Sequence, residues 1–104
     1  MAPRQGDILH LAQPKMYILV LSRAFFNASG LVAVCPVVAS AAPDALHIPV
    51  STDRFNGIAL LEQLRTLDLQ ARWYSQAGRI DLTQIQDISD AVQNIFDYFP
   101  SSDG

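Results

Sequence analysis

Short apolar stretches, separated by turn residues, occupy most of the first eighty positions of the chain. They are rich in Val, Ile and Leu, and such runs are typical of strands when Gly, Pro, Asn or Asp bound them. The breaks supply the backbone geometry that turns need. The pattern predicts five strands, over residues 8–11, 17–22, 31–38, 46–50 and 58–64.

The period of the apolar positions changes after residue 80. Apolar residues then recur three and four positions apart, which places them on one face of a helix. Thr83 and Gln86 have the spacing of a capping box, and Pro100 stops the pattern. The sequence therefore predicts one helix over residues 81–99, followed by a tail over 100–104. The apolar stripe of this helix comprises Ile85, Ile88, Val92, Ile95 and Phe99.

The chain has 104 residues, the length of one domain, and we place that domain at residues 1–104. Half of the residues are hydrophobic and 16% are charged, which suits a buried core and disfavours a disordered chain. Strands over residues 1–80 followed by one helix predict the α+β class. We expect a strongly bent antiparallel sheet, or small β-barrel, packed by the C-terminal helix.

The sequence also bears on the compartment of the protein. Cys35 is the only cysteine, so it cannot form an internal disulfide, and the class of small disulfide-rich secreted proteins is excluded. No apolar stretch approaches the roughly 20 residues that a membrane helix needs, and residues 1–10 contain no hydrophobic signal region. We therefore predict a cytoplasmic protein without a membrane partner.

The formal net charge of −3 hides an uneven distribution. Residues 1–80 carry all seven basic side chains and five acidic ones, whereas residues 81–104 carry five Asp and no basic residue. The local field decides where phosphates dock. A polyanion should therefore bind the first eighty residues.

Few residues have the pattern of a known catalytic or metal site. His10 and His47 have no Cys, Asp or Glu at the i+3 or i+4 spacing of a helical metal site, so no metal is expected. We expect surface or strand roles for both histidines. Cys35 falls within a strand pattern, which favours a buried, unreactive thiol. No Gly-rich phosphate loop or nucleophile elbow occurs.

The only glutamate of the chain, Glu62, falls in the apolar segment 58–64. In an extended strand Glu62 would share a face with Leu60, and Gln63 would share the other face with Arg65. A carboxylate on a mostly buried strand needs a cation or a shifted pKa, so Glu62 is either an ion-pair anchor or a general base. Three arginines then recur every seven residues: Arg65, Arg72 and Arg79. They form either a phosphate-binding edge or solvated charge at the ends of strands.

Several motifs occur in the order of a known family. The most specific is Glu-Gln-Leu-Arg-Thr-Leu-Asp at 62–68, preceded by Gly57. Gly-Asp-Ile at 6–8 is similar to the family's opening strand, Val-Cys-Pro at 34–36 to its third strand, and Gly-Arg-Ile at 78–80 to the segment before its final helix. Through these motifs the chain resembles, nearly end to end, the MazF/PemK (Kid) toxins of bacterial toxin–antitoxin modules.

This resemblance implies an SH3-like barrel with a C-terminal helix, a homodimer, and metal-independent cleavage of single-stranded mRNA without a cofactor. It also implies inhibition by a cognate acidic antitoxin. The reaction would be attack of a ribose 2′-hydroxyl on the adjacent phosphate, which needs a base, an acid and a cation. The resemblance places the base on Glu62. We expect Arg65 to be the second catalytic residue, as a source of positive charge. We expect RNA contacts at Lys15, Arg23, Ser40, Gln63 and Arg72.

Three catalytic contacts of the family's pattern, at four positions, are replaced in this chain. Met16 replaces a basic residue, residues 38–39 replace a Thr-Ser pair, and Leu60 replaces an arginine, while the first loop is shortened to residues 12–15. The gyrase-poisoning CcdB toxins also have a short first loop and are similar at residues 36–41. The alternatives are therefore a CcdB-like poison of DNA gyrase and a toxin-like binding partner without catalytic activity.

Overall fold

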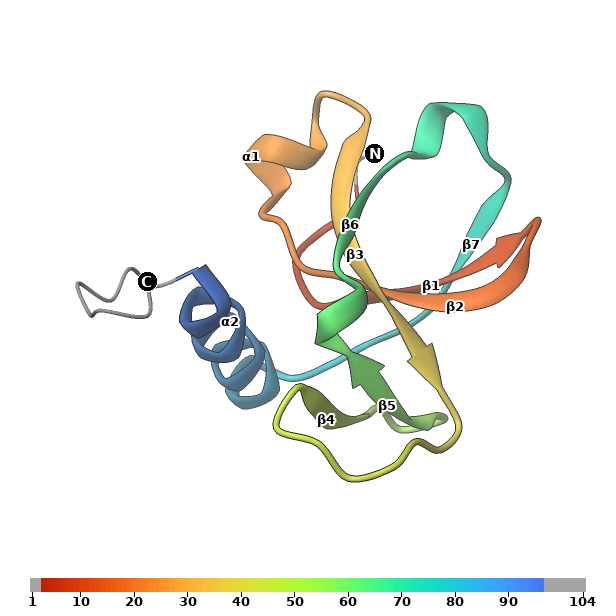
Figure 1. Ribbon diagram of the computed structural model, residues 1–104. Coiled ribbons are helices and arrows are strands. Elements are labelled where there is room, and N and C mark those ends of the chain that lie inside the picture. Colours follow the sequence, from red (N-terminus) through yellow and green to blue (C-terminus); the bar gives the residue numbers. More distant parts are fainter. Residues whose placement is uncertain (1–2, 97–104) are drawn as a thin grey trace.

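A strongly bent sheet forms the body of the protein in the computed structural model, which describes residues 3–96 apart from the side chains of residues 24 and 25 (Figure 1). Seven antiparallel strands lie within these residues: β1 (Asp7–Ala12), β2 (Lys15–Val20), β3 (Leu31–Val38), β4 (His47–Ser51), β5 (Asn56–Leu60), β6 (Arg65–Asp68) and β7 (Tyr74–Arg79). Their order is β4-β5-β3-β2-β1-β7, and β6 also pairs with β3. The helical elements are α1 (Ala24–Asn27), α2 (Leu82–Phe96) and the 3₁₀ turns η1 (Leu61–Gln63) and η2 (Leu69–Ala71).

The predicted architecture is confirmed, because one bent antiparallel sheet is packed by one C-terminal helix. The first four predicted strands correspond to β1–β4. The fifth, over residues 58–64, is wrong in its second half: β5 ends at Leu60 because Leu61 turns into the core and opens η1. The sequence did not predict β6 and β7.

The long helix α2 starts at Leu82, one residue after the predicted start. The end of the predicted helix, residues 97–99, and the tail over 100–104 lie outside the described residues. Within the part of the chain that the structure describes, no helix has the length and apolar character to cross a membrane.

Asp81 caps α2, since its Oδ1 accepts a hydrogen bond from the backbone N of Gln84 at 2.9 Å. The predicted capping box of Thr83 and Gln86 is therefore wrong, because both residues lie inside the helix. The amide side chain of Gln84 bonds instead to the backbone of Ser51, accepting from its N at 2.8 Å and donating to its O at 3.1 Å. This contact joins the start of α2 to the end of the edge strand β4.

The central strands β1, β2 and β3 bury side chains on both of their faces. Successive side chains point to opposite faces of a strand, so Ile8 and Leu9 of β1 enter two different cores. This two-sided burial explains why these strands read as continuous apolar runs. The helix-side core comprises Ile8, Leu19, Cys35, Val37, Val50, Ala59, Leu61, Ile80 and Ile88. The β6-side core comprises Leu9, Leu11, Ile18, Val20, Val32, Val34, Leu67 and Leu69.

Buried polar side chains tie down the ends of the strands. Asp7, which is 5% exposed, accepts hydrogen bonds at Oδ1 from Arg79 Nη1 at 2.9 Å and from Gln76 Nε2 at 3.1 Å. Asn27 is also buried, and its Nδ2 donates to the backbone O of Pro3 at 2.7 Å. These bonds attach β7 to β1 and the N-terminal segment to α1.

Candidate active site

The turn η1 lies where one edge of β3 changes its partner. β5 pairs with Val37 and Val38, β6 pairs with residues 31–34, and η1 joins the two strands between them. Leu61 is 1% exposed, and its backbone N donates to the O of Leu46 at 2.9 Å. With Leu61 anchored inward, the next two residues of the turn, Glu62 and Gln63, are directed to the surface.

The Glu62 carboxylate meets an imidazole there. Glu62 Oε2 lies 2.7 Å from His47 Nε2, and His47 Nδ1 lies 2.6 Å from the backbone O of Ala42. The Glu62 side chain is 39% exposed and that of His47 is 16% exposed. The predicted location of Glu62 on a buried strand is therefore wrong, and its partner is a histidine that the sequence did not connect with it.

The hydrogen bonds determine where protons lie in the pair of Glu62 and His47. A backbone carbonyl only accepts, so Nδ1 of His47 carries a hydrogen toward Ala42. The short contact between Nε2 and Oε2 then requires a second proton between the ring and the carboxylate. The bond to Glu62 first, and the bond to Ala42 second, raise the pKa of His47 above its ordinary value. The pair thus places a carboxylate beside a histidine of raised pKa at one accessible point.

Three basic residues gather at the hairpin that connects β1 to β2. Arg65 Nη2 lies 3.8 Å from Met16 Sδ in β2, and Arg72 Nη1 donates to the backbone O of Gln13 at 3.3 Å. Lys15 is exposed at the start of β2. We call Lys15, Arg65 and Arg72 the hairpin rim. This rim begins three residues after Glu62, so its positive charge follows the acidic site along the chain.

The other two predicted contact residues are placed differently. Arg23 follows β2 at the end opposite to Lys15, and a strand of six residues spans about 20 Å, so the two side chains do not meet. Ser40 is exposed in the loop between β3 and β4. The same loop supplies Ala42, whose carbonyl contacts His47. Ser40 therefore shares a loop with a residue that contacts His47, and Arg23 does not belong to the hairpin rim.

Sequence reasoning missed His47 as a partner of Glu62, although a signal was present. His47 is paired with Leu60 in the β4–β5 hairpin, which sets its ring beside η1. The hairpin turns at residues 52–55, and counting outward from that turn along both strands aligns position 47 with position 60. Spacing along the chain alone hides this contact.

The thiol of Cys35 is buried, as predicted, and takes no part in this site. Burial, followed by the nearby negative charge of Glu62, raises the pKa of Cys35 to about 12, so the thiol stays protonated at neutral pH. Among residues 3–96, no three His, Cys, Asp or Glu side chains are grouped in a way that could hold a metal ion.

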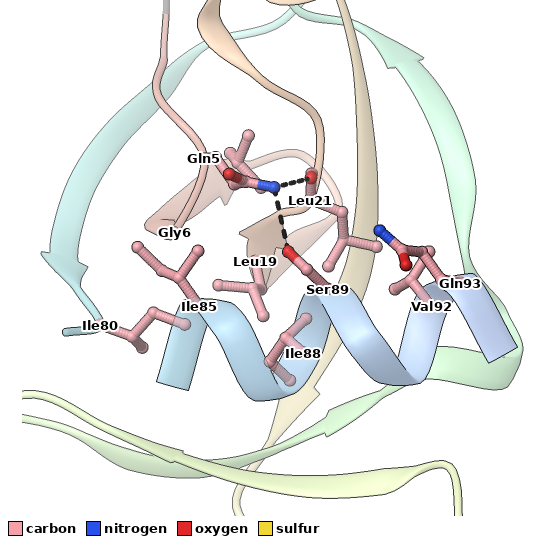
Figure 2. A pocket seen from close by; sticks show the side chains of 11 residues that line it. Gln5, Gly6, Leu19, Leu21, Ile80, Ile85, Ile88, Ser89, Val92 and Gln93 are labelled. Atoms are coloured by element: carbon pink, nitrogen blue, oxygen red, sulfur yellow. Dashed lines mark hydrogen bonds between the residues drawn. The ribbon is translucent and has the colours of Figure 1, made fainter. Parts of the chain in front are cut away.

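Apart from the Glu62 site, a hollow of about 200 Å³ lies between α2 and the sheet (Figure 2). Ile85 and Ile88 project into it from α2, and Gln5 Nε2 spans it by donating to Leu21 O at 3.1 Å and to Ser89 Oγ at 3.3 Å (Figure 2). Its lining residues are apolar side chains, amides, a glycine and one serine. None of these side chains titrates near neutral pH, so this hollow offers no group for acid–base chemistry.

Comparison with known proteins relates this arrangement to one family. Residues 4–96 match the family described as "PemK-like, MazF-like toxin of type II toxin-antitoxin system". No curated protein matches the chain. Among solved structures, a chain of the MazE–MazF crystal structure from Deinococcus radiodurans superposes with a TM-score of 0.82 at 22% identity, covering 92% of this chain and 97% of that one.

Two mycobacterial structures have the same fold. An endoribonuclease solved with its cognate antitoxin, from a mycobacterial species, has a TM-score of 0.80 at 13% identity and covers 95% of this chain and 100% of that one. Mycobacterium tuberculosis toxin MazF-mt6 has a TM-score of 0.71 at 17% identity, covering 90% and 98%. These matches do not favour the CcdB-like alternative. With 93 consecutive residues covered by the family match, the chain belongs to the PemK-like, MazF-like toxins of type II toxin–antitoxin systems.

Proposed function

We propose that this toxin is an endoribonuclease that cleaves single-stranded mRNA without a metal ion. A ribose 2′-hydroxyl attacks the adjacent phosphate and forms a 2′,3′-cyclic phosphate. The bond from phosphorus to the 5′-oxygen of the next nucleotide breaks, and this oxygen leaves as a hydroxyl after taking a proton from water. The observation that carries the proposal is the exposed Glu62 carboxylate, held by His47 at 2.7 Å and followed by the basic hairpin rim. The expected substrate is RNA without base pairing, because an unpaired nucleotide can place its 2′-hydroxyl in line with the bond that breaks.

Glu62 has a free oxygen for the role of general base. Its Oε2 is engaged by His47, and no side chain or backbone group of residues 3–96 forms a hydrogen bond to Oε1. Oε1 can therefore accept the proton of a 2′-hydroxyl, while the bond to His47 fixes the direction of the carboxylate. A positioned base of this kind contributes about 10²–10⁴-fold to the rate.

Arg65 supplies the cation that the developing negative charge on phosphate requires. Its guanidinium reaches Met16, the position at which the resemblance leads us to expect a basic residue. A thioether sulfur is only a weak acceptor, so the remaining N–H groups of Arg65 stay available for phosphate oxygens. This placement supports Arg65 as the substitute for the missing basic side chain.

The same proposal includes the partners of the toxin. The hairpin rim is a basic surface that suits an acidic antitoxin segment, and pairing of two copies would place two such rims on one dimer. Two of the similar structures were solved with MazE or a cognate antitoxin. We propose a homodimer that acts on mRNA in the cytoplasm and is inhibited by an acidic antitoxin.

The test is incubation of the purified protein with a long single-stranded RNA in EDTA, with cut sites read by primer extension. Wild type should cut at discrete sites. Glu62→Gln keeps an acceptor for His47 and should lower the rate about 10²–10⁴-fold, while circular dichroism shows that the variant is still folded. Asp53→Asn, which neutralises an exposed carboxylate in the β4–β5 turn, is the matched control and should cut normally.

Two outcomes would contradict the proposal. Full cleavage by Glu62→Gln would remove Glu62 from the role of base. A folded wild-type protein that leaves several long RNAs intact would exclude the ribonuclease activity itself.

A further inference from the structure

Trp73 is the most exposed large apolar side chain in the described part of the protein. It follows η2, precedes β7, and is 86% exposed. Aromatic side chains normally bury most of their surface, because they bring a large gain when they leave water. A ring left open to solvent in a folded protein is available as a stacking surface for a planar ligand.

The backbone beneath this ring is held firmly. The O of Trp73 accepts a hydrogen bond from the N of Ala12 at 3.0 Å, at the end of β1. Its neighbour Arg72 is bonded twice, through its backbone N to the O of Leu69 at 3.3 Å and through Nη1 to the O of Gln13 at 3.3 Å. The exposure of Trp73 is thus a property of an ordered segment, and the ring can bind a ligand without first ordering a loop.

The ring borders a hollow of about 410 Å³ between the hairpin and η2. This end of the molecule, where the tip of the β1–β2 hairpin approaches the blue-green turn before β7, lies far from α2 in Figure 1. The hollow offers an aromatic face, a guanidinium, a carboxamide and a carboxylate. Its lining residues are Ala12, Gln13, Asp68, Ala71, Arg72 and Trp73.

This combination matches the chemistry of a nucleobase. Unpaired bases are bound by stacking on aromatic rings or guanidinium planes and by hydrogen bonds to their polar edges. Trp73 offers the stacking surface, Asp68 accepts from base amino groups, and the Gln13 side chain both donates and accepts. Arg72 adds positive charge where the phosphate of the same nucleotide would lie.

Basic side chains lie between the hollow and the proposed active site. Arg65, three residues after Glu62, touches Met16, and Lys15 lies between Met16 and the hollow in the hairpin. A strand of RNA on the hairpin rim would therefore pass from Glu62 to the hollow over basic side chains. We infer that the hollow beside Trp73 binds an unstacked base of the single-stranded RNA substrate. The inference rests on the proposed ribonuclease function for the identity of its ligand.

Trp73 is the only tryptophan of the chain, so its fluorescence reports on the hollow alone. The experiment titrates the full-length protein with short single-stranded RNAs of mixed sequence whose 2′-hydroxyls are methylated, which prevents cleavage. Stacking should quench the fluorescence in a saturable way. Because the Trp73 variants lack tryptophan, their binding is followed by the anisotropy of a dye attached to the RNA, with wild type measured in the same way. In this assay Trp73→Ala should weaken binding about 5- to 150-fold, the usual effect of removing one stacking platform. Trp73→Phe should retain most of the affinity.

Tyr74→Ala is the matched control, because this neighbouring exposed aromatic residue borders a different hollow, with Pro3 and Asn27. It should bind the RNA like wild type. Circular dichroism and Tm of each variant establish that it is folded before its affinity is compared.

The outcomes separate this inference from the proposed function. Tight RNA binding with unchanged fluorescence, and with Trp73→Ala equal to wild type, overturns the inference and leaves the ribonuclease proposal standing. The absence of any RNA binding refutes both. A wild-type fluorescence change that follows protein concentration without RNA, together with loss of dimerisation in Trp73→Ala by light scattering, would assign the hollow to an interface between two copies and overturn the inference.

Discussion

Leu61 packs into the helix-side core immediately before the Glu62 carboxylate, so its truncation should weaken the fold and the site together. The side chain is 1% exposed and contacts a fully buried cluster. Leu61→Ala removes three carbon groups, worth about 2.4 kcal/mol at roughly 0.8 kcal/mol each. The cavity left behind adds to this, and core Leu→Ala substitutions cost about 2.7–5 kcal/mol in total. Because η1 is a short turn that can relax around part of the cavity, we expect a loss of about 3 kcal/mol.

Urea denaturation measures this loss directly, and thermal unfolding should show it as a fall in Tm of about 12–24 °C. Leu82→Ala is the matched control, because it makes the same chemical change at a side chain that is 69% exposed at the start of α2. Its free energy of unfolding should change by less than about 0.5 kcal/mol.

The same variant tests whether Leu61 positions the acidic site. In wild type the bond to Glu62 raises the pKa of His47. If truncation of Leu61 loosens η1, an NMR titration of His47 should show this pKa moving back toward its ordinary value. Equal stability losses for Leu61→Ala and Leu82→Ala would refute the packing argument, and an unchanged pKa of His47 would show that other contacts hold the carboxylate.

Two further perturbations have defined signs. Because the pKa of His47 is raised in the folded protein, the stability that its bond to Glu62 adds is complete below about pH 6.5 and is lost as the pH rises through the raised value. The Tm difference between wild type and His47→Gln should therefore shrink on going from acid to alkaline pH, and a constant difference would contradict the assignment. Gly6→Ala should lower the free energy of unfolding, measured by urea denaturation, more than Gly30→Ala does. Both glycines have a positive φ, so the backbone strain is common to the two variants. A Cβ at position 6 would lie 2.6 Å from Ile85 Cδ1 in α2, whereas a Cβ at position 30 would meet the exposed amide of Gln70. Equal losses of stability in the two variants would show that α2 shifts to accommodate the new methyl group without strain.

The elements that the sequence predicted are those with a strong apolar period. β1, β2 and β3 stand out because both of their faces are buried, and α2 stands out because one face is. β7, over Tyr74–Arg79, is an edge strand of mostly exposed residues and has no such period. β6 has four residues, of which only Leu67 is buried. Short, polar edge strands are defined by their pairing and not by their own composition.

For the candidate site as well, the sequence predicted one part and not the other. The motif at 62–68 drew attention to Glu62 and Arg65, but an apolar run of this length is compatible with either a strand or a turn. Only the pairing of β5 and β6 with different parts of β3 shows that Glu62 lies in η1. The contact with His47 depends in turn on the β4–β5 hairpin. Both facts are tertiary, so the sequence pointed to the residues without their geometry.

The two cores that share β1, β2 and β3 have a consequence for how these strands find their alignment. A strand that is apolar on one face only cannot slip by one residue, because the slip would turn its apolar set toward water. In a strand buried on both faces, a slip exchanges one apolar face for the other, so the apolar pattern penalises it little. A slip would, however, separate Asp7 from Arg79 and leave a buried carboxylate unpaired, at high cost. The alignment of β1 with β7 thus depends on this polar pair at the strand ends, and substitution of Asp7 or Arg79 should misalign the two strands as well as weaken their pairing.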